Sequence, residues 1–302
     1  MTETAGANRP LQGILWMILT GFCFVMVTAL VKTLGGSVPA AESAFLRYVL
    51  GLVFLIPIWR SLAATRLTAR QWRIFSLRGA FHTLGVICWF YAMSRIPIAE
   101  VTAMNYLNPI YVSILAVFFL GERIALRRIM AICAALLGTV MILRPGFREL
   151  DPGHVAMLVT ALMFGGSYLT AKMMSDEVPA TVVVAMLSLT VTVGLFPFAV
   201  WVWEWPTLHE LAVLFGVAAA ATGGHYAMTR AFAAAPVTVT QPVVFLQLIW
   251  SVAIGAIFFG EPPDPFVIAG GGVILASVIF ITFREQQLKR RAITPHVHET
   301  KG

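Results

Sequence analysis

The sequence predicts an all-α integral membrane protein with ten transmembrane helices, arranged as two inverted repeats of five helices. Three observations lead to this prediction: the composition, the apolar runs and an internal duplication. Hydrophobic residues make up 59% of the 302 residues and charged residues only 12%, and the mean hydropathy is +0.85. A soluble globule of this length needs more polar surface. The composition therefore places most of the chain in lipid.

Ten apolar runs are about as long as a helix that crosses a bilayer, roughly 20 residues. The first follows a short polar leader without a small-residue cleavage site, which favours a membrane helix over a cleaved signal. Only a short charged segment separates the fourth run from the fifth, and glycine or proline interrupts several runs. In chain order the runs are 12–32, 40–59, 72–94, 98–120, 127–144, 153–174, 180–202, 209–231, 237–259 and 265–283.

The chain repeats itself, which indicates an old duplication. Lys32 and the dipeptide 38–39 (Val-Pro) recur with the same spacing as Lys172 and 178–179. Each repeat holds five runs, and because five is odd the second repeat enters the membrane from the opposite side. The resulting boundaries are a leader at 1–11, repeats at 12–147 and 148–283, and a basic tail at 284–302.

The positive charges fall unevenly on the two sides of this arrangement. If the N-terminus is inside, four cations lie outside, namely Lys32, Arg95, Arg144 and Arg148. Positive charge marks the cytoplasmic side, so both termini are expected in the cytoplasm, with the protein in a cytoplasmic (inner) or plasma membrane. The basic tail is interpreted as a contact with the lipid bilayer, and no nucleic-acid partner is expected. The fifteen inside cations are Arg9, Arg60, Arg66, Arg70, Arg73, Arg123, Arg127, Arg128, Lys172, Arg230, Arg284, Lys289, Arg290, Arg291 and Lys301.

Inverted repeats are the architecture through which secondary transporters expose a site near the membrane midplane to each side in turn. A membrane enzyme is disfavoured because no span presents paired carboxylates, a metal-binding cluster or a nucleophile beside a base. The absence of a nucleotide-binding loop argues against direct use of ATP. No catalytic residue, metal or cofactor is predicted. A membrane scaffold without transport activity and a membrane enzyme stay as the alternatives of another class.

Two stretches carry a family resemblance. The first runs from Leu107 and Pro109 through 118–122 (Phe-Phe-Leu-Gly-Glu) to 143–145 (Leu-Arg-Pro), and the second is 258–261 (Phe-Phe-Gly-Glu). These motifs resemble the EamA family of the drug/metabolite transporter superfamily over about residues 13 to 283, although Leu248 stands where the second copy of Pro109 would be.

The resemblance implies ten helices and the movement of a small organic solute that is amino-acid-like, vitamin-like or nucleoside-like. A drug or metabolite efflux permease of broad specificity is the alternative. The substrate itself, the direction of transport, the energy coupling and the choice between monomer and homodimer stay open.

Arg47 is the first candidate for the substrate site. It lies about 12 Å inside the second run, where an arginine costs about 2.5–3.5 kcal/mol. A cavity-facing role, with a substrate carboxylate as one partner, and a role in holding helices together are both open. Glu42 is a poor partner for Arg47 because five residues place it roughly 140° round the helix. Glu42 is a candidate for proton coupling, or it stabilises the positive end of its helix.

Amide and aromatic residues in the fourth and ninth runs are the second group of candidates. Asn105 and Asn108 lie beside Pro109, whose missing N–H frees a carbonyl that a cavity could satisfy. When the two repeats are aligned, Asn108 matches Gln247 and Tyr111 matches Trp250. We therefore expect Asn105, Asn108, Tyr111, Gln241, Gln247 and Trp250 to line the substrate path, the alternative being amide bonds between helices.

Further candidates lie in the third, sixth and eighth runs. Trp89 and Tyr168 are expected to contact the substrate, and His82 and His225 are candidates for proton coupling because an intramembrane histidine can relay protons. Packing histidines are the alternative. The lysines at 32 and 172 and the Gly-Glu pairs at 121–122 and 260–261 are interpreted as structural, as helix-end anchors and turns.

Overall fold

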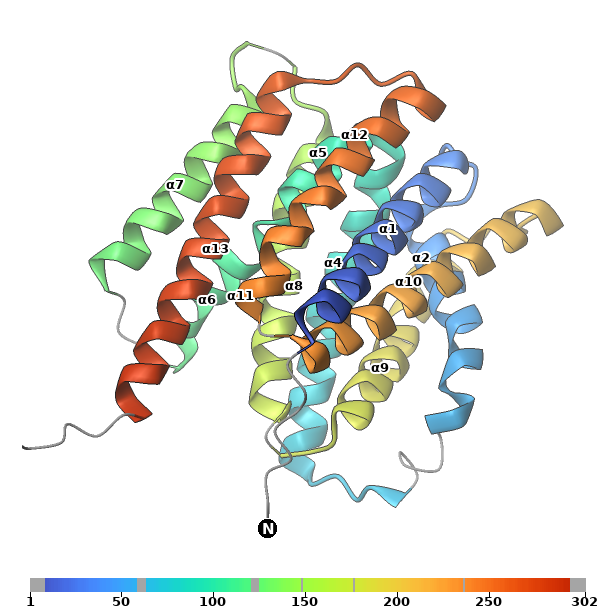
Figure 1. The fold of residues 1–302 in the computed structure, drawn as a ribbon. Coiled ribbons are helices and arrows are strands. Elements are labelled where there is room, and N and C mark those ends of the chain that lie inside the picture. Colours follow the sequence, from blue (N-terminus) through green and yellow to red (C-terminus); the bar gives the residue numbers. More distant parts are fainter. Residues whose placement is uncertain are drawn as a thin grey trace, which may run out of the picture.

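The computed structural model is a bundle of helices (Figure 1) and describes residues 9–58, 64–120, 125–147, 149–175, 177–235 and 237–293. The first half contains α1 (Pro10–Thr33), α2 (Ala40–Gly51), the 3-10 helix η1 (Leu52–Ile58), α4 (Ala69–Arg95), α5 (Ile98–Asn105), α6 (Asn108–Leu120) and α7 (Leu126–Leu143). The second half contains α8 (Pro152–Ser175), α9 (Ala180–Trp201), α10 (Leu208–Ala234), α11 (Val237–Thr240), the 3-10 helix η2 (Gln241–Val244), α12 (Phe245–Phe259) and α13 (Pro265–Ile293).

Corresponding helices of the two halves begin with the same local device. Thr68 caps α4 and forms a capping box with Gln71, and Thr207 caps α10 with Glu210 in the same way. In each box the hydroxyl accepts a backbone N–H that the first turn leaves without a partner. The two boxes occupy equivalent positions in the two repeats, so the internal repeat extends to the hydrogen bonds that start these helices.

The part of the chain that the structure describes contains nine helices, counting those with a break as one, that are long and apolar enough to cross a membrane. The chain is a multi-pass membrane protein. The predicted run 72–94 falls in α4, which is not among the nine. Arg70, Arg73, Arg78 and His82 lower the hydropathy of this 27-residue helix, although Arg78 and His82 are buried in the bundle.

Three of the predicted runs are interrupted: the second passes from α2 into η1, and the fourth and ninth are broken helices. α5 ends at Asn105 and α6 begins at Asn108, next to Pro109, while the ninth run divides into α11, η2 and α12. The hydroxyl of Tyr106 donates to the backbone carbonyl of Val244 at 3.1 Å and so joins the breaks of the fourth and ninth runs.

The tenth run also differs from its prediction, because α13 extends past 283 to Ile293. Residues 284–291 contain Glu, Gln, Lys and Arg, which favour helix continuation.

The two halves pack against each other along their helices. α1 lies along α10, α4 along α8, α7 along α13 and α2 against α9, each pair joining the first half to the second. α7 and α13 meet at Gly138 and Gly270, where an added Cβ would come within 2.7 and 2.5 Å of the facing carbonyl oxygen. Glycine thus lets two backbones approach closely, as at other helix interfaces in lipid.

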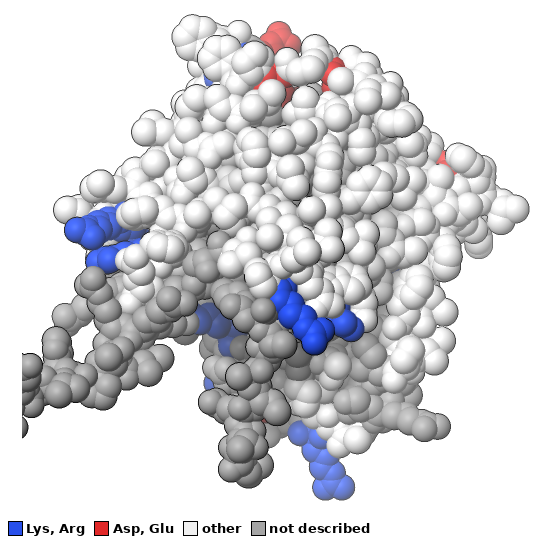
Figure 2. Space-filling view, viewed as in Figure 1, with Lys and Arg blue, Asp and Glu red and all other residues white. Residues whose placement is uncertain are grey.

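Charge separates toward the two ends of the bundle. In Figure 2 the broad middle of the visible face carries no charged side chain, most visible Lys and Arg lie toward the lower end, and Asp and Glu lie toward the upper end. We call the end where α1 stops at Thr33 the Lys32 end. α2 begins there, as do α5, α8, α10 and α13.

Candidate functional site

Polar side chains from four helices come together inside the bundle. His82 lies about 20 Å along α4, near the middle of the helix. Arg47, Arg78 and His82 are only 9%, 5% and 8% exposed. We call the following set the central cluster: Arg47 and Tyr48 of α2, Arg78 and His82 of α4, Ser167 and Tyr168 of α8, and His225 of α10.

His82 joins three helices of the cluster. Its Nδ1 lies 3.1 Å from the hydroxyl of Ser167, and its ring stacks on Phe164 with centroids 4.6 Å apart and planes 20° apart. The ring of Tyr48 meets it edge-on at 6.3 Å. The sequence identified His82 as a candidate for proton coupling, and the structure places it in a site where helices of both halves meet.

The two arginines of the cluster form no ion pair with a carboxylate of the described chain. The guanidinium of Arg47 lies 4.1 Å from the centroid of the Tyr48 ring, a cation–π geometry. Arg78 donates from Nη1 to the backbone carbonyl of Val183 at 2.7 Å, while its buried Nε finds no hydrogen-bond partner among the described residues. Sequence reasoning missed Arg78, although the argument from the cost of a membrane arginine that identified Arg47 applies equally to it.

His225 and Tyr168 complete the cluster. His82 and His225 both lie within electrostatic range of Arg47 and Arg78. Tyr168 lies within electrostatic range of Tyr48 and Arg78 on other helices, and yet its side chain is 41% exposed. His225 is also exposed and contacts Phe24 of α1 at 5.1 Å. The rest of the bundle therefore does not cover the cluster completely.

Trp89 and Glu42 lie nearer the Lys32 end. The indole of Trp89 packs edge-on against Phe164 at 6.0 Å, and its buried Nε1 has no partner. Glu42 is fully buried and accepts the backbone N–H of Glu204 at 2.9 Å. Glu42 therefore links α2 to the segment that precedes α10, and the structure shows no ion pair between it and Arg47 in the described chain.

The amide and aromatic candidates from the fourth and ninth runs lie at helix interfaces. Tyr111 packs against Gly165 of α8, and Gln247 and Trp250 pack against Gly21 of α1. Asn108 keeps a buried Oδ1 without a partner. In the described chain no hydrogen bond or ring contact joins these residues to the central cluster.

Asn105 is half-buried at the end of α5. Gln241 begins η2, and its side chain lies outside the described part of the structure, as do the residues of the first Gly-Glu pair at 121–122. That all of these residues line the substrate path stays a prediction.

Ion pairs between the two halves close the Lys32 end. Lys32 Nζ lies 2.6 Å from Glu261 Oε1 and donates to the carbonyl of Ile96 at 2.8 Å. The second oxygen of Glu261 accepts the backbone N–H of Ile98 at 2.9 Å. Lys32 and Glu261 were interpreted separately as an anchor and a turn, and the structure joins them across the two halves.

Further contacts at this end also cross between the halves. Arg95 pairs with Asp151 at 3.1 Å, Arg144 pairs with Asp264, and His154 Nε2 lies 2.5 Å from Glu100 Oε2. Every expected outside cation that the structure describes is therefore engaged by a carboxylate of the other half. Separating the halves at this end requires that these contacts break.

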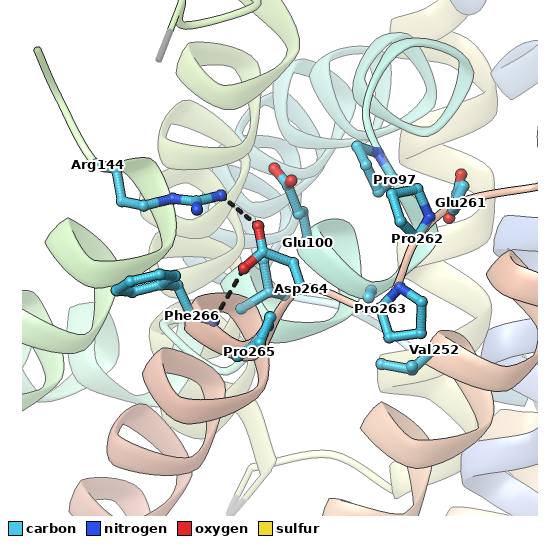
Figure 3. A pocket seen from close by; sticks show the side chains of 12 residues that line it. Pro97, Glu100, Arg144, Val252, Glu261, Pro262, Pro263, Asp264, Pro265 and Phe266 are labelled. Atoms are coloured by element: carbon cyan, nitrogen blue, oxygen red, sulfur yellow. Dashed lines mark hydrogen bonds and ion pairs between the residues drawn. The ribbon is translucent and has the colours of Figure 1, made fainter. Parts of the chain in front are cut away.

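A pocket of about 420 Å³ lies at the same end (Figure 3). The proline-rich segment Pro262–Pro265 forms one wall, and Figure 3 shows Arg144 reaching toward Asp264 across it, with Glu100 behind. A second pocket of about 280 Å³ lies between the end of α1, the start of α2 and the end of α4. Within the described residues no group of three His, Cys, Asp or Glu side chains could hold a metal ion.

Known proteins resemble this chain over almost its whole length. A riboflavin transporter of Rhizobium johnstonii is 29% identical over 94% of this chain and 95% of its own. A pseudopaline exporter of Pseudomonas aeruginosa is 26% identical over 90% and 96%, and an S-adenosylmethionine uptake transporter of Rickettsia prowazekii is 26% identical over 92% and 94%.

A solved crystal structure superposes with a TM-score of 0.57 at 17% identity, covering 90% of this chain and 98% of that one, which is a likeness of fold. The model of the EamA-like transporter family matches residues 11–144 and again residues 151–283, so the two halves are copies of one family unit. The chain therefore belongs to the EamA-like transporter family and is a membrane transporter, not an enzyme.

Proposed function

We propose that the chain is a secondary transporter that moves a small organic metabolite by alternating access, with the central cluster as its substrate site. The solute is amino-acid-like, vitamin-like or nucleoside-like. Transporters named for riboflavin, pseudopaline and S-adenosylmethionine, each similar over nearly the whole chain, support this range of solutes. No cofactor takes part, and the protein works as a monomer or a homodimer.

The observation that carries the proposal is the packing between the halves. If the repeats at 12–147 and 148–283 are inverted copies, α1 corresponds to α8 and α4 to α10. The pair α1–α10 is then equivalent to the pair α8–α4, and both pairs are present. Each half can adopt the arrangement of the other when such an axis relates them, and this exchange moves the opening from one side to the other.

This topology needs α4 as a tenth membrane helix. α4 is 27 residues long, or about 40 Å at 1.5 Å per residue, which is enough to cross a bilayer. Its polar groups Arg78 and His82 face other helices, where polar residues of membrane proteins lie. With ten helices both termini lie on one side, and the positive-inside rule makes this the cytoplasmic side.

The ion pairs at the Lys32 end fit one state of the cycle. Lys32–Glu261, Arg95–Asp151 and Arg144–Asp264 all join the first repeat to the second. We assign this arrangement to the state in which access from the outer side is closed. Opening that side exchanges these contacts for others while the halves rock against each other.

Counterflow in proteoliposomes tests the proposal. Vesicles that contain the purified protein are preloaded with an unlabelled solute from a panel of amino acids, vitamins and nucleosides, and uptake of the labelled solute is followed. We expect saturable uptake that preloading accelerates, because a carrier returns faster when loaded. Linear uptake without acceleration would indicate a channel, and no uptake of any solute would contradict the proposal. Competition by many unrelated solutes would favour a permease of broad specificity.

A further inference from the structure

The central cluster and its neighbour Trp89 have more hydrogen-bond donors than acceptors. The Nε of Arg78 and the Nε1 of Trp89 are buried and have no hydrogen-bond partner among the residues that the structure describes. Both groups can only donate. A buried donor without an acceptor costs free energy. A ligand that supplies acceptor atoms at these two positions would remove that cost.

The cluster also keeps its positive charge. Neither Arg47 nor Arg78 takes part in an ion pair with another described residue, so no described carboxylate offsets their charge. The carboxylate of Glu42 is engaged at the Lys32 end by the N–H of Glu204. Ion pairs that join two described residues include Lys32–Glu261, Arg70–Glu177, Arg95–Asp151, Arg144–Asp264 and His154–Glu100.

Aromatic side chains adjoin the two charges. Phe164 of α8 is itself only 5% exposed and packs against His82 at 4.6 Å, Trp89 at 6.0 Å and Tyr168 at 6.3 Å, of which Trp89 is half-buried and Tyr168 exposed. On α4, Arg78, His82 and Trp89 share one face, since four and eleven residues are close to whole turns of a helix. The charged side chain of Arg78 and the aromatic side chain of Trp89 therefore lie on the same face of α4, about 16 Å apart along the helix axis.

We propose that the transported solute is an organic oxyanion, a carboxylate or a phosphate ester, that also has a planar apolar portion. Its oxygens accept hydrogen bonds from Arg47 and Arg78, and its planar portion lies along Tyr168 and Trp89. This inference rests on the proposed transport function and names the chemical class of its substrate.

The physical chemistry of the two arginines favours this class over neutral and cationic solutes. A guanidinium matches the geometry of a carboxylate or phosphate with paired hydrogen bonds. The protein interior strengthens that attraction because its effective dielectric constant is well below that of water. The same field repels a cation, and a neutral amide receives only weaker hydrogen bonds.

Binding to the purified full-length protein is the first test. The probes are phenylacetate, phenyl phosphate and the neutral phenylacetamide, which share one ring and differ in the polar group. We expect at least one of the two anions to bind about 10- to 100-fold more tightly than the amide, the range for hydrogen bonds to a charged group. The stronger of the two anions identifies the preferred oxyanion.

Variants then assign the binding to the cluster. Arg78→Gln is expected to weaken binding of the anion about 10- to 100-fold and to leave binding of the amide nearly unchanged. Arg78→Lys keeps the charge and is expected to fall between the two. The matched control Arg66→Gln removes an exposed arginine outside the cluster and should change neither affinity.

The outcomes separate this inference from the proposed function. If neutral or cationic solutes show saturable counterflow while both anions neither bind nor compete, the inference is wrong and the transport function stands. If no solute of any charge shows counterflow, the transport function fails and the inference fails with it. If Arg78→Gln does not fold, the comparison of anion with amide on the unmodified protein still decides.

Discussion

The ion pair between Lys32 and Glu261 offers the sharpest prediction. In Glu261→Gln the side chain keeps its shape and can still accept the N–H of Ile98, but it loses the charge opposite Lys32. The two side chains are only 17% and 12% exposed, and their charged atoms lie 2.6 Å apart. Removing one partner costs about 3–5 kcal/mol for a fully buried pair and about 0–1 kcal/mol for an exposed pair. For this largely buried pair we expect about 2 kcal/mol.

That cost falls on the arrangement in which the Lys32 end is closed. About 2 kcal/mol changes an equilibrium between closed and open forms roughly 30-fold. A lysine without its carboxylate must still be accommodated, and its remaining bond to the Ile96 carbonyl survives in the variant. Glu261→Gln is therefore expected to open this end more often.

Thiol labelling measures the opening. Ser43 is 2% exposed and lines the second pocket at the Lys32 end, so a cysteine there reacts with a membrane-impermeant reagent only when this end opens. In a background without Cys23, Cys88 and Cys133, we expect Glu261→Gln to raise the labelling rate of Ser43→Cys roughly 30-fold.

The controls use charge exchange and a matched pair at the other end. The exchange of Lys32→Glu with Glu261→Lys should restore slow labelling, whereas Glu177→Gln, which breaks the exposed pair with Arg70, should leave the rate unchanged. Equal rates in Glu261→Gln and the unmodified pair would refute the reasoning, and so would failure of the exchange to restore slow labelling.

Three further predictions concern packing, capping and the substrate path. Gly138→Leu places a side chain against the backbone of α13 and is expected to lower the stability by about 1–3 kcal/mol. The measurement is the Tm in detergent. The control Leu137→Ala, at a 64% exposed position, is expected to change the Tm little. Thr68→Ala removes the capping box of α4 and should cost about 1 kcal/mol, measured in the same way. A ligand at 100 times its Kd stabilises the protein by about 2.7 kcal/mol, which raises the Tm. Asn108→Ala and Gln247→Ala are expected to reduce this rise. An undiminished rise in both variants would show that neither residue lines the path.

Much of the fold could be predicted because a membrane helix is determined by the local amino-acid sequence. A run of about 20 apolar residues is a property of neighbouring positions, and nine of the ten runs match helices of the required length and hydropathy. α4 is the exception because Arg70, Arg73, Arg78 and His82 lower its hydropathy, and two of these, Arg78 and His82, belong to the central cluster. The break near Pro109 was also predictable, because proline lacks the N–H that a helix interior uses and is favoured in the first turn of a new helix.

The candidate site was only partly predictable. Arg47, Tyr168, His82 and His225 were identified from their polarity inside apolar runs, and the structure brings them into one cluster. The same signal at Arg78 was overlooked. The amide pair Asn108 and Gln247 matched well in sequence, but Gln247 packs against Gly21 of α1, and among the described residues no hydrogen bond joins either amide to the cluster.

The membrane class, the two repeats and the residues whose charge is costly in lipid could be read from the chain without coordinates. They follow from local composition and from the comparison of one segment with another. Which of these residues meet became known only from the packed bundle. Lys32 stands in the first repeat and Glu261 near the end of the second, yet their charged atoms lie 2.6 Å apart, and Arg78 joins Arg47 only because α4 packs between α2 and α8. Side chains on different helices become neighbours through helix packing, which no single stretch of sequence encodes.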